Sequence, residues 1–363
     1  MMNKKKIDEF NAEKKEIARY EWLDFLKGIA ALLVVLGHSI VTPVRNSNVV
    51  LMTLSDCIYY FHMPLWMILS GYCAGISLKK NRYQLSSKWI KKKTIQLVLP
   101  YFAYALFVYA VFVGAAAFPI GLQLMQRGNI SIIPFENYIL QMFTGMNTYC
   151  GHLWYLYVLF LFYLLLYVMN KLFKEKCCYA FFLISIAVML LRGGIRTNTV
   201  NVFITHIPQL MVCFATGLFL ELEKVDLRKI AVTSVLIISW LYVKSLGFMT
   251  ETTVLGKEIV YIGERMSRIC ISILFLLIAE AYFRNFKNGF MSRKVSYLGK
   301  KCMDIYIWQT PFFTTIVGTL LSKLITNGYI VTILTVVSGL IFPILISMVF
   351  GKFKHILHSI QQS

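Results

Sequence analysis

The chain has 363 residues, of which 58% are hydrophobic and only 15% are charged, whereas soluble domains carry about 25% charged residues. Long apolar blocks recur along the chain, which excludes an ordinary soluble domain. The net charge is +20, but the basic residues lie between the apolar blocks and not along one folded face, so we expect no nucleic-acid binding. The eight Cys have neither CxxC spacing nor His partners, so we expect no metal site.

Apolar windows of roughly 20 residues, the length that crosses a bilayer, predict an all-α, polytopic membrane bundle of about ten transmembrane helices. The predicted helices begin near Leu23, Ser55, Ile95, Leu153, Cys178, Val202, Ile230, Val260, Met303 and Tyr329. The fifth and the seventh are short. We divide the chain into an N-terminal segment (1–22), a transmembrane domain (23–350) and a C-terminal tail (351–363).

The distribution of Lys and Arg predicts the orientation of this bundle. An even number of spans puts both termini on one side, and the segments on that side hold 28 of the basic residues, against 7 on the other. Cytoplasmic loops are enriched in Lys and Arg, so we expect both termini in the cytoplasm and the protein in the inner or plasma membrane. The first twenty residues lack the apolar region of a cleavable signal peptide.

Ionisable side chains at membrane depth are costly and mark candidate sites. At a rise of about 1.5 Å per residue, His38 lies in the outer half of the first predicted span. By the same rise, His62 lies about 10 Å below the outer face in the second span. Glu264, Arg265 and Arg268 lie about 10–17 Å down in the eighth span. We therefore predict that side chains from three helices share one slab of the bilayer.

Some of these residues also have a structural interpretation. Glu264 and Arg268 are four residues apart, so a self-neutralising ion pair explains them as well as a functional role does. Arg265 has no acid four residues away and is expected to need a partner elsewhere, which favours a polar cavity. A buried residue such as His62 can also be a hydrogen-bonded part of the core.

Further candidates lie near the outer face. His152 and Trp154, at the start of the fourth span, either contact a substrate or anchor the chain at the membrane interface. Cys57 and Cys150 are the cysteines nearest that face, so a disulfide bracing the long outer loop (118–151) is a further hypothesis.

Two blocks carry a family resemblance. The run from Trp22 to Ser39 resembles the first membrane helix of the acyltransferase 3 family of integral membrane O-acyltransferases, whose most specific mark is a basic residue, ten intervening residues and His. Lys27 and His38 fit that mark. The run from Tyr60 to Tyr72 is similar to the family's second helix in its Phe-His-Met-Pro and Ser-Gly-Tyr elements. Shorter similar segments are Pro100-Tyr101 and His152-Leu153-Trp154-Tyr155-Leu156.

The resemblance implies acyl-CoA, most often acetyl-CoA, as a cytoplasmic donor, and a cell-envelope glycan or related carbohydrate as acceptor. Such a transfer needs a base near neutrality, and His is the natural choice. It proceeds either directly or through an acyl-histidine intermediate. We expect catalysis by His38, Glu264 and Arg268, substrate binding by Lys27, His62, Arg265, His152 and Trp154, and contacts to the CoA phosphates from Lys91, Lys92 and Lys93.

Two positions depart from the family pattern. Lys91 to Lys93 stand where family members commonly have Arg, and Gln309 stands where His is often found. An alternative of another class is a proton-coupled transporter or glycan exporter, which would also carry intramembrane His, Glu and Arg. Against it, the sequence has no internal repeat and no pair of Gly- or Pro-broken half-helices.

Overall fold

A computed structural model describes residues 4–127, 130–145, 147–194, 206–222 and 254–360. The described part of the chain is helical and contains no strand, so the predicted all-α class is confirmed. Two compact units form: residues 1–66 with 270–363 make the first unit, and residues 67–269 make the second. Helices α3 and α12 each contribute residues to both units.

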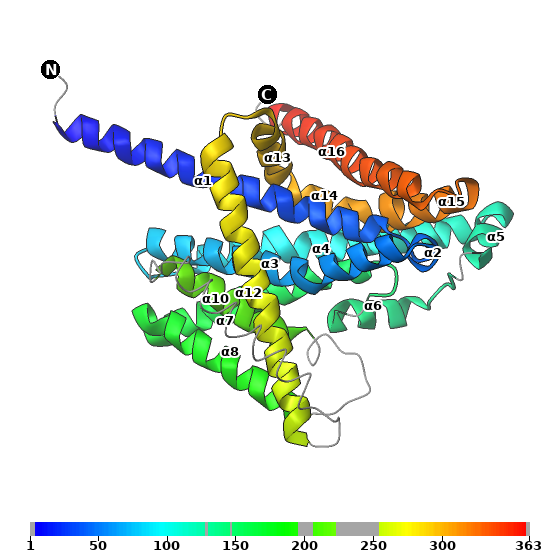
Figure 1. The fold of residues 1–363 in the computed structure, drawn as a ribbon. Helices are drawn as coiled ribbons and strands as arrows, with labels where there is room; N and C mark the ends of the chain where they lie inside the picture. The colour runs from blue at the N-terminus through cyan, green and yellow to red at the C-terminus, as the bar shows by residue number, and fades with distance from the viewer. Residues whose placement is uncertain (1–3, 128–129, 146, 195–205, 223–253, 361–363) are drawn as a thin grey trace. The chain divides into compact units, whose positions relative to one another are not determined.

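The first unit is built around α1. Its elements are α1 (Lys4–Ser39), α2 (Thr42–Ser47), the start of α3 (Val49–Lys80), the end of α12 (Val254–Phe286), α13 (Phe290–Lys300), α14 (Cys302–Trp308), η3 (Gln309–Ile316), α15 (Val317–Leu324) and α16 (Gly328–Ile360). Helix α1 packs against α13, α14, η3 and α16 (Figure 1). Gly28 and Gly299 permit the close approach of α1 and α13, since a Cβ atom at either would overlap the backbone of the other helix.

The second unit is a separate group of helices. It contains the remainder of α3 and α12, with α4 (Ser87–Ala116), α5 (Pro119–Arg127), α6 (Phe135–Thr144), η1 (Gly151–Leu153), α7 (Trp154–Phe173), η2 (Lys174–Lys176), α8 (Cys177–Gly194) and α10 (Ile207–Leu222). Helix α7 packs against α4 and α8, and α8 packs against α10. The short turn η2 connects α7 to α8.

Six stretches of the described residues are long and apolar enough to cross a membrane: Glu21–Ser39, Val49–Lys80, Ser87–Ala116, Gly151–Leu191, Ile262–Phe286 and Gly328–Val349. The predicted multi-pass membrane protein is thereby confirmed. The fourth and fifth predicted spans correspond to the single stretch that contains α7 and α8. The sixth corresponds to the shorter helix α10, and the seventh (230–246) lies outside the described residues. The assignment of sides stays a prediction.

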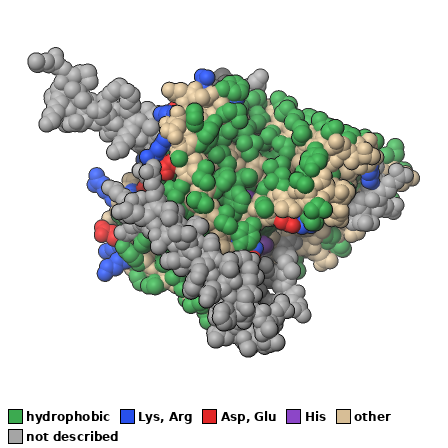
Figure 2. All heavy atoms as spheres, viewed as in Figure 1, with side chains coloured by type: hydrophobic (Ala, Val, Ile, Leu, Met, Phe, Trp, Pro, Cys, Tyr) green, Lys and Arg blue, Asp and Glu red, His purple; other side chains and the backbone are tan. Residues whose placement is uncertain are grey.

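The outer surfaces of these helices are apolar. On α16, for example, the side chains of Ile333, Val337 and Ile341 are 62%, 45% and 49% exposed. Figure 2 shows hydrophobic side chains over much of the face that it draws. Exposed aliphatic side chains on a long helix are what a lipid environment requires.

The ninth predicted span, expected as one helix from Met303, is broken. Helix α14 ends at Trp308, and Thr310 is extended, with φ −117° and ψ 140°. Pro311 favours the break, because proline disfavours the helical conformation in the preceding residue and lacks an N–H to donate. The following turns form the π-helix η3 before α15 resumes the α-helical pattern. Such π-helical interruptions occur frequently at functional sites.

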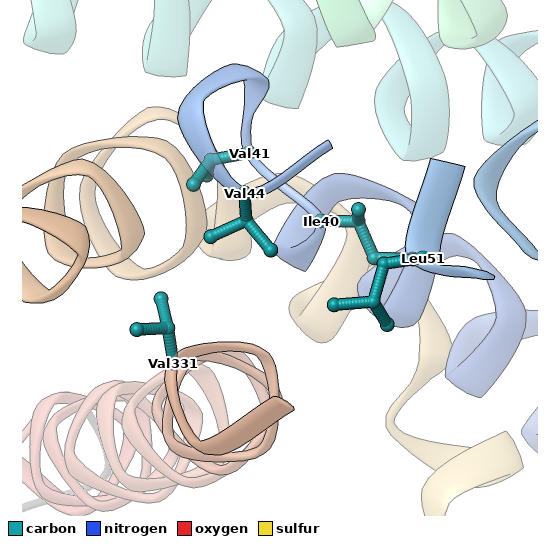
Figure 3. Close-up of a cluster of buried hydrophobic side chains, with 5 residues drawn as sticks. All are labelled: Ile40, Val41, Val44, Leu51 and Val331. Atoms are coloured by element: carbon teal, nitrogen blue, oxygen red, sulfur yellow. The ribbon is translucent and has the colours of Figure 1, made fainter. Parts of the chain in front are cut away.

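A buried apolar cluster fixes the chain just after α1. Its members are Ile40 and Val41, which follow α1, Val44 of α2, Leu51 of α3 and Val331 of α16 (Figure 3). The partly buried Leu321 and Ile325 pack against them. Since Ile40 follows His38 by two residues, the cluster also holds the end of α1 where His38 lies.

Candidate functional site

His38 lies in the last turn of α1, within the first unit. Its imidazole is half-buried. Its Nδ1 atom lies 3.4 Å from Thr310 Oγ1, at the break between α14 and η3. The ring also faces that of Tyr59 on α3, with centroids 6.2 Å apart. Three segments that are distant in sequence therefore meet around this histidine.

His62 lies on the same side of α3 as Tyr59, one turn further along the helix. It is only 3% exposed, and its ring meets Tyr59 edge-on at 5.0 Å. Its Nδ1 lies 2.8 Å from the carbonyl oxygen of Ile58. A carbonyl only accepts, so Nδ1 donates and Nε2 is the unprotonated nitrogen of the neutral ring. The two predicted histidines thus contact one tyrosine ring, while their roles stay predictions.

Three residues beside His38 were missed as site candidates in the sequence: Gln309, Thr310 and Thr314. Thr310 and Thr314 are joined by a 2.8 Å hydrogen bond between their hydroxyls. Gln309 is wholly buried and interacts with the His38 ring, although neither of its amide atoms makes a hydrogen bond of ordinary geometry among the described residues. The available signal was the Thr-Pro pair in the middle of an apolar span, where a helix break exposes backbone groups.

The charged residues of the eighth predicted span lie on α12, within the second unit. Glu264 Oε1 is 2.5 Å from Arg268 Nη2 and 3.8 Å from Arg265 Nη1. The neighbouring carboxylate thus reaches both guanidinium groups, and the expectation that Arg265 needs a further partner from elsewhere stays a prediction. The slab shared with His38 and His62 stays a prediction, since those histidines belong to the first unit.

His152 and Trp154 lie at the start of α7 in the second unit. His152 is buried and meets the ring of Tyr104 edge-on at 6.2 Å. Trp154 stacks on His206, with ring centroids 4.1 Å apart and planes 12° from parallel. Both aromatic contacts fit the anchoring alternative, and substrate binding by either residue stays a prediction.

The predicted donor-binding lysines have different surroundings. Lys27 lies 4.0 Å from Asp24 on α1. Lys91 and Lys92 are exposed near the start of α4, whereas the Lys93 ammonium lies over the ring of Tyr163 at 4.5 Å. Lys91 and Lys92 are thus open to a soluble anion. No group of His, Cys, Asp and Glu in the described part of the chain is arranged to hold a metal ion.

The predicted Cys57–Cys150 disulfide is not formed in this structure, but it stays a hypothesis because its two residues belong to different units. Both residues are free cysteines, Cys57 exposed and Cys150 buried. The backbone N–H of Cys150 donates to Asn147 Oδ1 at 2.8 Å, which fixes the turn before α7. Burial raises the pKa of the Cys150 thiol to about 12, and a buried, protonated thiol is unreactive.

Comparison with known proteins identifies relatives of this chain. The model of a family described as "Acyltransferase domain" matches residues 20–352. The chain is 38% identical over 79 residues to "Nodulation protein NolL" of Sinorhizobium fredii, and this match covers 21% of each protein. The chain thus matches about a fifth of the length of that relative. No solved structure matches.

Proposed function

This chain belongs to the acyltransferase 3 family and is a multi-pass membrane acyltransferase; from that premise we propose that it is an O-acyltransferase. The proposed donor is cytoplasmic acetyl-CoA, and the proposed acceptor is a hydroxyl group of a cell-envelope glycan. The proposed location is the plasma membrane, because the basic loops then face the cytoplasm.

The observation that best supports this proposal is the setting of His38. It lies on a membrane helix eleven residues after Lys27, is half-buried, and is bordered by the hydroxyl of Thr310 and the ring of Tyr59. An imidazole in a largely apolar setting, with one nitrogen held by a protein group, is suited to accept a proton from an alcohol.

In the proposed reaction His38 acts first as a base and then as an acid. The acceptor hydroxyl gives its proton to His38 while its oxygen forms a bond to the thioester carbonyl carbon. The resulting tetrahedral oxyanion collapses, the C–S bond breaks, and the CoA sulfur leaves with the proton that His38 returns. The products are an O-acetyl ester and free CoA, so the base is regenerated in each cycle.

The remaining residues enter this proposal as predictions from the sequence. Lys27, Lys91, Lys92 and Lys93 would meet the phosphates of CoA as point charges. Glu264 and Arg268 are proposed to take part in catalysis. Contacts to substrate are proposed for four residues: His62, Arg265, His152 and Trp154.

The proposal is tested with purified protein in liposomes, given acetyl-CoA and glycan extracted from cells that carry the gene. We expect free CoA and O-acetylated glycan, both measured by mass spectrometry, to form together. His38→Ala should lower both by about 10²–10⁴-fold, the usual contribution of a general base. His355→Ala, near the end of α16, is the matched control and should keep activity.

Two outcomes would overturn the proposal. Full activity of well-folded His38→Ala would remove His38 as the base. Movement of glycan across sealed vesicles without release of CoA would replace the transferase with the transporter alternative.

A further inference from the structure

A chain of side-chain hydrogen bonds leads from His38 to the backbone of the broken helix. Thr310 Oγ1 lies 3.4 Å from His38 Nδ1 and 2.8 Å from Thr314 Oγ1. Thr314 Oγ1 in turn lies 3.1 Å from the carbonyl oxygen of Gln309. All four residues belong to the first unit, and Thr314 is wholly buried.

The end of this chain fixes the direction of every bond in it. A carbonyl oxygen has no hydrogen, so the Thr314 hydroxyl must donate to Gln309. A hydroxyl has one hydrogen, so Thr314 can only accept from Thr310, and Thr310 spends its own hydrogen in that bond. Thr310 therefore has only lone pairs to offer to His38, and the bond between them requires Nδ1–H of His38 as the donor.

This direction sets the tautomer of His38. A neutral imidazole carries one hydrogen, so a ring that donates from Nδ1 has an unprotonated Nε2. Nε2 is then the atom that can take a proton. The Gln309 side chain also interacts with the ring, but its amide can present either its oxygen or its NH2 group and so fits both tautomers. Without Thr310 the ring can therefore carry its hydrogen on either nitrogen, and only one of the two forms presents a base at the correct atom.

The helix break makes the chain possible. Thr310, which precedes Pro311, is extended, and its hydroxyl meets that of Thr314, four residues further along. On the neighbouring helix, Gly339 leaves room for Thr314, since a Cβ atom there would lie 2.7 Å from Thr314 Cγ2. Backbone and packing thus both hold the two hydroxyls in place.

We propose that Thr310 and Thr314 are positioning residues that hold His38 in the Nδ1–H tautomer and so present Nε2 as the base. The assignment of the tautomer follows from the hydrogen bonds alone. The effect of the tautomer on turnover rests on the proposed function. His62 provides an internal contrast, because its Nδ1–H is held by the Ile58 carbonyl of its own helix. Its tautomer should not depend on the two threonines.

The tautomer is measured by nitrogen NMR of the full-length protein with ¹⁵N-labelled histidine, in lipid and without substrate. The chain has 6 His, so a His38→Gln spectrum assigns the His38 signals by difference. We expect Nδ1–H for His38 in the wild type. Thr314→Val should move the hydrogen to Nε2, because the freed Thr310 hydroxyl can then donate to Nδ1. Thr310→Val should give a mixture of tautomers, and Thr310→Ser should restore the wild-type spectrum.

Two comparisons separate this role from a general loss of structure. Thr315→Val alters an exposed residue of the same π-helix, and Thr335→Val alters a buried threonine whose hydroxyl donates to its own helix at Val331. Both should leave the His38 tautomer unchanged, and the His62 signal should be unchanged in every variant. A wild-type His38 protonated on Nε2, or a tautomer insensitive to Thr310 and Thr314, would overturn the proposal.

Turnover gives a second readout. With acetyl-CoA as donor and the extracted glycan as acceptor, Thr310→Val should lower kcat about 10–100-fold, the usual cost of removing a group that orients a functional histidine. KM for acetyl-CoA should not change, and Thr310→Ser should recover kcat. If His38→Ala is fully active while the tautomer shifts occur as described, the proposed function fails and the tautomer assignment stands. Shifts that occur without loss of kcat in Thr310→Val would refute the effect on turnover.

Discussion

Helix α16 and the α14–η3–α15 segment are both apolar, and each contains a proline, yet only one of them breaks. Pro343 lies inside α16, which continues for 33 residues, and Pro64 and Pro100 likewise lie inside continuous helices. Pro311 instead separates α14 from η3, with Thr310 extended before it. Proline alone therefore does not explain the break.

The neighbours of the two prolines differ. Pro343 is flanked by Phe342 and, two residues away on either side, by Ile341 and Leu345, all about half exposed. Around Pro311, the hydroxyls of Thr310 and Thr314 bond to each other, and the Thr314 hydroxyl also donates to the carbonyl of Gln309. In a membrane, freed backbone groups are tolerated only where the protein satisfies them. A broken helix with its own hydroxyls is thus both permitted and polar, which marks it as a place for chemistry.

The most direct test of this comparison replaces each proline by alanine. Pro311→Ala removes the restriction on Thr310, which can then become helical and carry its hydroxyl away from His38. We expect acetyl transfer to fall about 10–100-fold, because a displacement of about 1 Å near the reacting group has effects of that size. Pro343→Ala should keep activity within about twofold, since its helix is already continuous.

Thermal unfolding in lipid is the control for that pair. Both variants should remain folded, so that the difference lies in turnover. Equal activity of the two proteins would show that the break at Thr310 has no part in the reaction.

A smaller effect is expected where α16 contacts η3. A Cβ atom at Gly339 of α16 would lie 2.7 Å from Thr314 Cγ2 and 3.0 Å from Val35 Cγ1. Thr314 is β-branched and has few alternative rotamers, so Gly339→Ala should displace its hydroxyl by a few tenths of an ångström. We expect kcat to fall about tenfold, less than for a displacement of about 1 Å.

The matched variant is Gly114→Ala on α4. A Cβ atom there would meet no atom within 4 Å, and alanine is the better helix former, so activity should be unchanged. If Gly339→Ala is as active as Gly114→Ala, the position of Thr314 does not limit turnover.

The same contrast explains what the sequence could predict. Long apolar runs specify their own helices, so α1, α3, α4, α7, α12 and α16 were foreseen from hydropathy, and the Lys27–His38 spacing marked one site residue. Thr310 and Thr314 were not foreseen, because two hydroxyls in an apolar run differ little from other threonines in a membrane helix. Their importance comes from a contact with His38, some 270 residues earlier, and hydropathy carries no information about such contacts.

Helix α12 is continuous, like α16, but it carries charged side chains. There Glu264 and Arg268 satisfy each other within one helix, as the structural interpretation of the sequence predicts. Each side chain is partly exposed, so Glu264→Gln alone should lower the unfolding midpoint by about 2–4 °C, which corresponds to about 1 kcal/mol. The double variant Glu264→Gln, Arg268→Leu should restore most of the midpoint, because only the weaker 3.8 Å pair of Glu264 with Arg265 is then still lost.

Activity of the same variants separates the two interpretations of the pair. If the pair is only structural, activity returns with stability in the double variant. Recovered stability without recovered turnover would instead assign the pair a role in catalysis.

The smallest effect is expected at Lys27 on α1, the helix that packs against both α16 and the α14–η3 segment. Lys27 precedes His38 by eleven residues, about 16 Å along α1, so its loss should leave the hydroxyl chain intact. If its ammonium binds a phosphate of acetyl-CoA, Lys27→Ala should raise KM about three- to tenfold with kcat unchanged, as expected when binding is lost equally from substrate and transition state. Lys27→Arg should keep the charge and the KM, and Lys323→Ala, an exposed lysine of α15, should change neither constant. An unchanged KM in Lys27→Ala would leave Lys27 with its predicted topological role alone, whereas a fall in kcat would show that the part of α1 around Lys27 influences the polar segment around His38.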